Sequence, residues 1–425
     1  MKRHILAVVL LFTATLAIAQ NFTLPCVDAN YRDGVKSIQL YPVGEPLQQP
    51  LITLDNAMEA LSLSFDVLGS NAEVLNYTFL HCTHDWQLSD IQRILYVNGY
   101  DYDQIDNYDF SVNTLVDYVN YSLSFPNYDM MPLVSGNYLL VVFGDDMSEE
   151  NVYFTRRFMV LQEKGSIGAT IPKYAKDVSL SDTHHQLDIK ASLHNIMGAN
   201  AMQYTNVTIR QNGRWDNAVM GLKPSYVYPN YLSYDNNPLT VFEAANQYRR
   251  FSISNFHYQS EGIISITENR NYHVVQLDVD EVLANKPFTF YEDMHGMELV
   301  HVTNKNKIAD IEADYAVVNF SLEWPYELQN ADMYIFGALS DWDFTNENKM
   351  WYDAADRCYR GSLFLKQGYY NYLFAIVENG STRASLAETA GNFWETDNEY
   401  HLYLYYYNAI KGYDELIGYS LVSSH

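Results

Sequence analysis

Short runs in which apolar and polar residues alternate recur along almost the whole chain. Each run is bounded by Gly, Pro, Asn or Asp, and the clearest lie at residues 37–41, 61–66, 77–80 and 138–143. A period of two places alternate side chains on opposite faces of a strand, so each run is typical of a strand with one buried face. Helical periodicity is scarce, and residues 88–95 hold a short turn of helix at best. The chain is therefore predicted to be all-β, with tandem immunoglobulin-like β-sandwich domains.

The length of 425 residues exceeds what one hydrophobic core holds and predicts two to three domains. We expect an N-terminal β-sandwich domain at residues 20–164, closed by a strand at 153–160. The Gly-Ser-Ile-Gly stretch at 165–168 is interpreted as a linker. A middle β domain is predicted at 165–310, and an early-set immunoglobulin-like β-sandwich domain at 311–425.

The first nineteen residues have the features of a secretory signal peptide. Lys2 and Arg3 precede an apolar run at 5–18, and Ala17-Ile18-Ala19 forms a small-residue cleavage site before Gln20. The run is too short and too interrupted by Thr to span a bilayer stably. Cys26 lacks the small residues that precede a lipidated cysteine. The sequence therefore predicts a soluble exported protein with no membrane span.

Three cysteines, Cys26, Cys82 and Cys358, are too few for a disulfide framework. One bridge among them and three free thiols are both compatible with the sequence. Stability must then come from burial, which a content of 48% hydrophobic residues and 37 Tyr supplies. Tyrosine combines a large contact area with a polar tip, so it also suits surfaces that contact partners.

The formal net charge of −26 excludes some classes of partner. Such an acidic protein repels phosphate backbones, so nucleic-acid binding by counterion release is not expected. Anionic membrane surfaces are disfavoured for the same reason. The simplest role of the acidity is to keep a tyrosine-rich surface soluble.

Several clusters contain metal-ligating residue types, but each has a simpler interpretation. His81, Cys82, His84 and Asp85 lack the second downstream ligand pair of a local zinc site, and we interpret them as a strand end packed into a core. A second cluster is a string of aspartates, which calcium could bind but a solvated hairpin explains better: Asp101, Asp103, Asp106 and Asp109. A third cluster contains two adjacent histidines, which on a strand point to opposite faces and so cannot easily share a metal: Asp182, His184, His185 and Asp188.

Nucleophile elbows, His-Glu-x-x-His zinc motifs and phosphate loops are absent from the sequence. Paired carboxylates of a hydrolase remain an open alternative, because such pairs need closeness in space and not in sequence. We assign no catalytic residue, cofactor or metal, and predict that the protein is not an enzyme.

The C-terminal third carries a strand, a turn and a Trp at 334–342, followed by a Gly-Tyr-Tyr-x-Tyr-x-Phe pattern at 368–374. These residues resemble those of starch-binding and early-set immunoglobulin-like modules. That resemblance implies an aromatic platform that stacks on sugars, with Trp342 and Tyr372 as contact candidates. Glycan binding is therefore the alternative function, and packing of the same two rings in a core is the competing structural interpretation.

Ordered blocks along nearly the whole chain resemble the plug protein family of the type IX secretion system. The blocks lie at residues 38–41, 63–66, 81–86, 111–114, 125–127, 135–138, 156–158, 365–372, 395–400 and 416–418. The resemblance implies a periplasmic protein, associated with the inner side of the outer membrane, that seals the periplasmic mouth of the type IX translocon barrel. A wide barrel encloses an aqueous lumen, so an idle barrel needs such a seal. Candidate partner-binding residues are Trp86, Tyr100, Tyr102, Tyr108 and Asn113, in the Trp86 region and the 98–113 loop.

Overall fold

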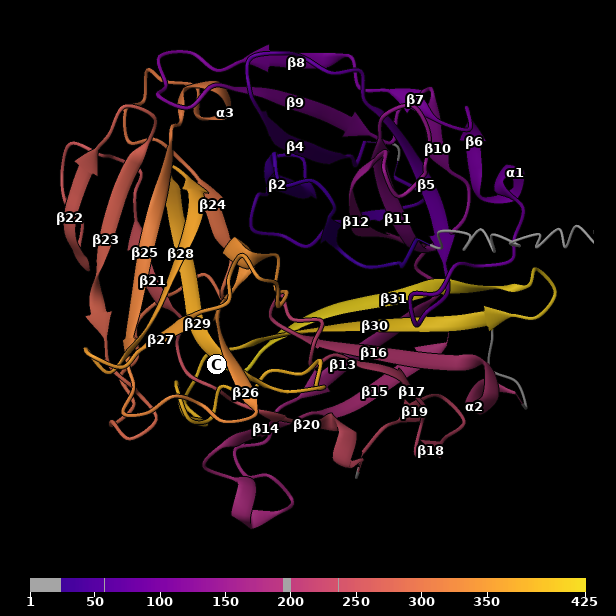
Figure 1. The fold of residues 1–425 in the computed structure, drawn as a ribbon. Helices are drawn as coiled ribbons and strands as arrows, with labels where there is room; N and C mark the ends of the chain where they lie inside the picture. Colours follow the sequence, from indigo (N-terminus) through magenta and orange to yellow (C-terminus); the bar gives the residue numbers. More distant parts are fainter. Residues whose placement is uncertain (1–23, 57, 194–199, 236) are drawn as a thin grey trace, which may run out of the picture.

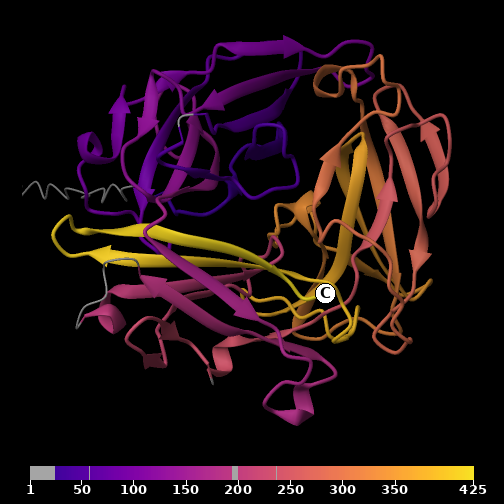
Figure 2. The ribbon, with the colours of Figure 1, turned by 180° about the vertical axis from the view of Figure 1, so that it is seen from behind.

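The computed structural model describes residues 24–56, 58–193, 200–235 and 237–425. Strands make up 46% of the described residues and helices 5%, so the predicted all-β fold class is confirmed. The strands form sandwiches arranged around a common centre, seen from opposite sides in Figures 1 and 2. The expected signal peptide at residues 1–19 lies outside the described residues. Within the described part of the chain, no helix is long and apolar enough to cross a membrane.

The first domain is a sandwich of two sheets. One sheet consists, in spatial order, of β1 (Ala29–Asn30), β12 (Val152–Leu161), β11 (Gly136–Phe143), β5 (Asn76–Cys82) and β7 (Asp103–Gln104), with β3 (Leu51–Thr53) parallel to β12. The other consists of β2 (Val35–Pro42), β4 (Leu61–Leu68), β9 (Tyr118–Phe125) and β8 (Asn107–Phe110). A short helix, α1 (Arg93–Tyr96), leads into β6 (Val97–Gly99), which pairs with β10 (Met130–Pro132).

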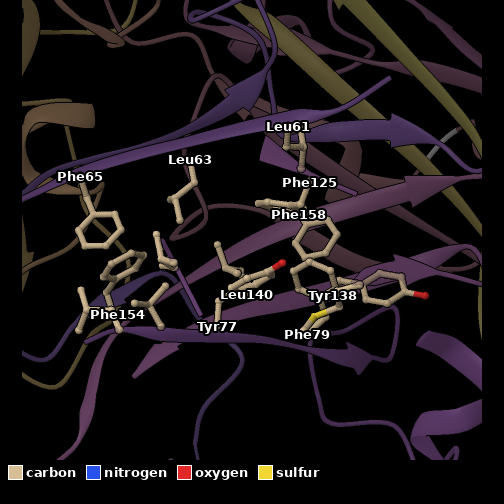
Figure 3. Packing of buried hydrophobic residues seen from close by; sticks show 14 of the residues in the cluster. Leu61, Leu63, Phe65, Tyr77, Phe79, Phe125, Tyr138, Leu140, Phe154 and Phe158 are labelled. Atoms are coloured by element: carbon tan, nitrogen blue, oxygen red, sulfur yellow. The ribbon is translucent and has the colours of Figure 1, made fainter. Parts of the chain in front are cut away.

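The core of this domain lies between the two sheets and is rich in aromatic rings, as Figure 3 shows. Phe65 of β4 meets Phe154 of β12 edge to face, with ring centroids 4.8 Å apart. Tyr138 stacks on Phe158 from the neighbouring strand. The alternating pattern of the sequence predicted that each strand has one buried face. The strands predicted at 61–66, 77–80 and 138–143 lie within β4, β5 and β11.

A second sandwich combines strands from two distant parts of the chain. Its first sheet runs through β13 (Gly165–Thr170), β15 (Asp188–Leu193), β19 (Leu232–Ser233) and β18 (Tyr226–Val227). Its second runs through β17 (Val219–Leu222), β16 (Thr205–Gln211), β30 (Glu399–Asn408) and β31 (Tyr413–Ser423). The remaining elements are η1 (Val178–Leu180), β14 (His184–Gln186), α2 (Ala201–Tyr204), η2 (Pro238–Thr240) and β20 (Val241–Glu243), of which β14 and β20 pair.

The third sandwich also draws on two parts of the chain. One sheet runs through β22 (Ile263–Glu268), β23 (His273–Asp280), β25 (Tyr315–Glu323), β28 (Cys358–Lys366) and β27 (Trp351–Asp353). The other centres on β29 (Gly368–Glu378), which pairs with β21 (Arg249–Ser252), β24 (Glu298–Val300) and β26 (Ala331–Phe336). Two short helices complete it, α3 (Ala309–Glu312) and η3 (Ala338–Ser340).

The strand pairing does not follow the predicted division at residue 310. Strand β16 of the predicted middle domain pairs along its full length with β30, and β21 pairs with β29. Local alternation identifies a strand but carries no information about a partner far away in the sequence. The predicted domains at 165–310 and 311–425 are therefore corrected to two sandwiches that both contain strands from each segment.

The predicted linker at 165–168 is also corrected, because these residues open strand β13. A side chain at Gly165 would place its Cβ only 2.8 Å from the carbonyl oxygen of Ser192 on the paired strand β15. The glycine therefore allows a close approach of two backbones rather than a flexible connection.

Candidate interaction surface

Four of the five predicted partner-binding residues are exposed on the first domain. Tyr100 and Tyr102 follow β6 and are 62% and 57% exposed, and Tyr108 lies on the edge strand β8, whose four residues are all exposed. Asn113 is also exposed, but its neighbour Val112 donates a backbone hydrogen bond to Ile311 of the third sandwich. Asn113 therefore lies at a junction between domains, away from Tyr100 and Tyr102.

The structure adds apolar residues that the sequence interpretation missed. Helix α1, the β6–β10 pair and the loops next to them expose six large apolar side chains, which we call the α1 surface: Ile94, Leu95, Tyr100, Tyr128, Met131 and Leu133. Adjacent apolar residues on a one-turn helix give no helical period, so the available signal was the pair Ile94-Leu95 directly after the polar Gln92-Arg93. Gathered exposed apolar side chains are typical of a protein–protein contact.

Hydrogen bonds hold the α1 surface in a defined shape. The Arg93 guanidinium donates to the carbonyl oxygens of Phe79 and Tyr100, both at 2.8 Å, and pairs with Asp101. At Gly99, where φ is +115°, a Cβ would lie 2.0 Å from the carbonyl oxygen of Asp129. Only glycine permits this approach of β6 to β10. The apolar side chains thus stand on a scaffold tied to the first-domain sheet.

Trp86 corrects the prediction for the fifth candidate, because its side chain is only 4% exposed. It packs against the Arg157 guanidinium, which lies 4.9 Å from its ring centroid. Arg157 in turn lies 4.5 Å from the ring of Trp215, and Arg210 lies 4.6 Å from that ring on the second sandwich. This alternating stack of Trp86, Arg157, Trp215 and Arg210, which we call the Trp–Arg stack, joins the first domain to the second sandwich.

Replacing Trp86 by Phe is expected to lower the unfolding free energy by about 1.5 kcal/mol, because the smaller ring leaves a gap beside Arg157. Urea denaturation measures this change. Trp351→Phe is the matched control, since Trp351 is exposed on β27 and its replacement should have an effect within about 0.5 kcal/mol. Equal stabilities of the two variants would contradict the role given to the Trp–Arg stack.

The predicted cluster at 81–85 is divided between two environments. His81 is buried among the rings of Tyr96, Tyr138 and Tyr413. The backbone N–H of His84 donates to Asp414 Oδ2, which also lies 3.0 Å from His84 Nδ1. These contacts connect the turn after β5 to the hairpin of β30 and β31. Throughout the ranges that the structure describes, no three His, Cys, Asp or Glu side chains are arranged to hold a metal ion.

Burial lowers the pKa of His81 to about 4, with Asp414 and a hydrogen bond with the Ser135 backbone opposing the shift. The unfolded chain binds a proton at this residue below about pH 6.5, whereas the folded protein does not until about pH 4. His81 therefore has no effect on stability above pH 6.5 and reduces stability as the pH falls from 6.5 towards 4. We expect the advantage of the wild type over His81→Gln to shrink by about 2 kcal/mol between pH 7.5 and pH 5.

Urea denaturation at the two pH values measures this difference. His257→Gln is the control, because His257 is exposed and its replacement should leave the pH dependence unchanged. A constant difference between the wild type and His81→Gln at both pH values would show that His81 is not kept neutral by burial.

The other predicted polar clusters are engaged in local contacts. Asp101 pairs with Arg93, and Asp103 accepts a hydrogen bond from Tyr77 at 3.3 Å. His185 is buried and lies within hydrogen-bond distance of Tyr400 and of the carbonyl oxygen of Trp394. Asp188 pairs with Lys176. The two clusters are thus spread over separate neighbourhoods.

Of the two rings of the glycan alternative, Tyr372 belongs to a core and Trp342 is half-buried against another core. Tyr372 is 5% exposed and packs against Phe251 and Phe320, and its hydroxyl donates to Asp280 at 2.7 Å. Trp342 packs edge to face against Tyr248 and Phe336. A sugar cannot stack on the buried ring of Tyr372, so the two residues do not form the shared aromatic platform predicted from their pattern.

A buried ion pair joins the first domain to the third sandwich. Lys366 Nζ donates to Asp66 Oδ2 at 2.6 Å and to the carbonyl oxygen of Asp310 at 2.7 Å, and both charged side chains are almost fully buried. Tyr315 and Asn120 also donate to the Asp66 carboxylate. The buried charges and donors of this network are all paired only when the two domains meet in this one arrangement, so the network fixes how the domains pack together.

A cavity of about 360 Å³ lies between the first domain and the third sandwich, and one of about 140 Å³ shares part of its lining, including Glu298 and Asp341. Burial raises the pKa of Glu298 to about 7, and the Asp341 carboxylate adds to the rise. The hydrolase alternative would need such a pair of carboxyl groups. Arg156 of β12, however, donates to Asp341 at 2.7 Å, so this carboxylate is engaged in joining the domains.

The fold and the surface define a class of protein: an all-β chain of joined sandwiches that exposes an apolar surface on its first domain. Residues 35–162, which hold that surface, match the family model described as type 9 secretion system plug protein 1st domain. The chain belongs to the type 9 secretion system plug protein family.

A crystal structure of a hypothetical protein from Parabacteroides merdae shares the whole architecture. It is 30% identical, has a TM-score of 0.90, and the match covers 94% of this chain and 100% of that chain. C-terminal domains of the antigen I/II polypeptides BspA of Streptococcus agalactiae and AspA of Streptococcus pyogenes also match. They are 7% and 8% identical over 91% of this chain and 98% and 99% of theirs, and their TM-scores of 0.16 support no shared fold. No curated protein matches the chain.

Proposed function

We propose that this protein is a periplasmic plug subunit that binds the outer-membrane translocon barrel of type IX secretion and seals its periplasmic mouth. The observation that carries the proposal is that the family match and the α1 surface coincide on the first domain. The family supplies the role, and the exposed apolar side chains supply a contact surface within the matched residues.

Two further features support a sealing role. The first domain is joined to the other sandwiches by the Trp–Arg stack, the His84–Asp414 contact and the Lys366–Asp66 pair. A body held in this way can close a wide opening without deforming. The family and the all-β fold also fit a structural, non-catalytic protein. The net charge of −26 opposes binding to anionic lipid, which leaves a protein as the expected contact.

Site-specific crosslinking tests the proposal. A photoreactive residue at position 100 should crosslink to an outer-membrane barrel protein in intact cells, because Tyr100 lies on the α1 surface. The same probe at position 326 is the control, since Tyr326 is equally exposed but lies on the third sandwich. Crosslinks from position 100 that contain no barrel protein, together with loss of the gene leaving envelope permeability unaltered, would overturn the proposal.

A further inference from the structure

Two of the three cysteines meet in the interior of the first domain. Cys26 precedes β1 and Cys82 ends β5, and two other strands separate β1 from β5 in the sheet. Each thiol nevertheless shifts the pKa of the other. Both side chains are buried in one apolar cluster with Leu139 and Trp86. The chain thus brings together two thiols that are far apart in sequence and come from non-neighbouring segments.

We propose that Cys26 and Cys82 form a disulfide bond in the exported protein. The proposal rests on the proposed function only for its oxidising compartment, because disulfides persist in the periplasm and not in the cytosol. The bond would join the segment that leads into the first domain to the end of a central strand. No other pairing of the three cysteines has this support in the structure.

The reaction is a thiol–disulfide exchange with an oxidised dithiol protein. One of the two cysteine thiolates attacks that disulfide and displaces one of its sulfurs, and the other cysteine thiolate then attacks the resulting mixed disulfide. The two cysteines together lose two protons and two electrons. The oxidant gains both and becomes a dithiol.

The two thiols have different surroundings in the folded protein. The neighbouring Cys82 thiol lowers the pKa of Cys26, and the Arg157 charge acts in the same direction against the effect of burial. The neighbouring Cys26 thiol, together with burial, raises the pKa of Cys82. Because both thiols are buried in the folded protein, exchange must occur before the segment around Cys26 is packed. The finished bond is then shielded from reductants.

The bond would reinforce the junction between the first domain and the second sandwich. Arg157 Nε donates to the carbonyl oxygen of Cys26 at 2.9 Å, and the same guanidinium lies in the Trp–Arg stack. The turn that follows Cys82 carries His84 and Trp86, which both make contacts across that junction. A covalent link between Cys26 and Cys82 would therefore hold the segment that contacts Arg157 and the turn that carries His84 and Trp86 in fixed positions relative to each other.

Cys358 provides an internal control. It opens β28 in the third sandwich, where its thiol donates to the carbonyl oxygen of Asp356 at 3.4 Å. Burial raises the pKa of its thiol. No cysteine of the described residues lies beside it, so it should remain a free thiol in the same protein sample.

Mass spectrometry of the full chain exported to the periplasm of a Gram-negative host tests the bond. After denaturation without reductant and treatment with N-ethylmaleimide, only Cys358 should carry the label, and a cross-linked peptide should contain Cys26 and Cys82. Prior reduction should give three labels. Three labels without reduction, or a bond that includes Cys358, would overturn the proposal, whereas loss of barrel crosslinking would leave this result untouched.

A second measurement addresses the effect of the bond on the fold. Reductant should lower the melting temperature of the wild type by about 5 °C, because it removes a cross-link from the unfolded chain. The Cys26→Ala/Cys82→Ala variant should melt at one temperature with and without reductant, and Cys358→Ala should behave as the wild type. An equal response of the double variant and the wild type to reductant would contradict the proposal.

Discussion

Replacing Lys366 by Met is expected to lower the unfolding free energy by about 4 kcal/mol, because it leaves the Asp66 carboxylate buried without its cation. The ammonium is held by Asp66 and by the Asp310 carbonyl oxygen, and it lies 4.3 Å from the ring of Tyr118. Methionine restores most of the volume but neither hydrogen bond. Urea denaturation followed by tyrosine and tryptophan fluorescence measures the loss.

The pH dependence of this variant provides a second signature. Burial already raises the pKa of Asp66, and the Lys366 charge opposes the rise. Removing the cation removes that opposition, so Asp66 in the variant takes up a proton at a higher pH than in the unfolded chain. A carboxyl group with a raised folded pKa gains stability as the pH falls through that pKa. The Lys366→Met variant should therefore recover part of its loss at lower pH.

Two control variants make the result specific. Lys349 pairs with Asp332 at the surface, and Lys349→Met should change stability by about 0.5 kcal/mol or less. Adding Asp66→Asn to Lys366→Met should restore part of the loss, since the amide carries no charge and can still accept from Tyr315. A Lys366→Met variant as stable as Lys349→Met would mean that the buried pair does not hold the domains together.

Introducing two charges into the α1 surface, by Ile94→Asp with Tyr100→Asp, is expected to weaken association with the translocon barrel at least about 100-fold. Buried apolar anchors of an interface each contribute about 2 kcal/mol or more when removed, and a carboxylate in their place also stays unpaired. The quantity measured is the amount of barrel protein that co-purifies at a series of bait concentrations.

The fold should tolerate these changes, because Ile94 and Tyr100 are largely exposed. The melting temperature of the variant should therefore match that of the wild type. Ile264→Asp with Tyr258→Asp is a matched control of the same residue types, exposed on the third sandwich. Equal co-purification by the two double variants would show that the α1 surface does not bind the barrel.

The sequence was sufficient for the fold class and for most individual strands, because alternation is a local property that each strand carries by itself. It was not sufficient for the arrangement of the strands. The partner of β16 is β30, and nothing near either strand in the sequence identifies the other. Gly165 misled for a similar reason, since its role depends on the backbone of Ser192 in a paired strand.

The sequence was likewise sufficient for some residues of the candidate surface and not for others. Tyr100, Tyr102 and Tyr108 were predicted to be exposed, and the polar residues around them gave a valid local signal. Trp86 had two interpretations, packing into a core at its strand end and contact with a partner, and the structure buries it against Arg157 and beside Trp215. A usable sign was Arg156-Arg157 within the apolar strand β12, because an arginine on a buried face needs a carboxylate or an aromatic partner.

The late position of the β30–β31 hairpin in the sequence affects how the chain folds during its synthesis. Strand β16 emerges from the ribosome long before β30, and its sheet stays open on that side until the later strand arrives. Long-range pairing of this kind is slow to form. If the protein is exported as proposed above, late closure of this sheet would keep the new chain unfolded for longer, which is the state that passage through a narrow export channel requires.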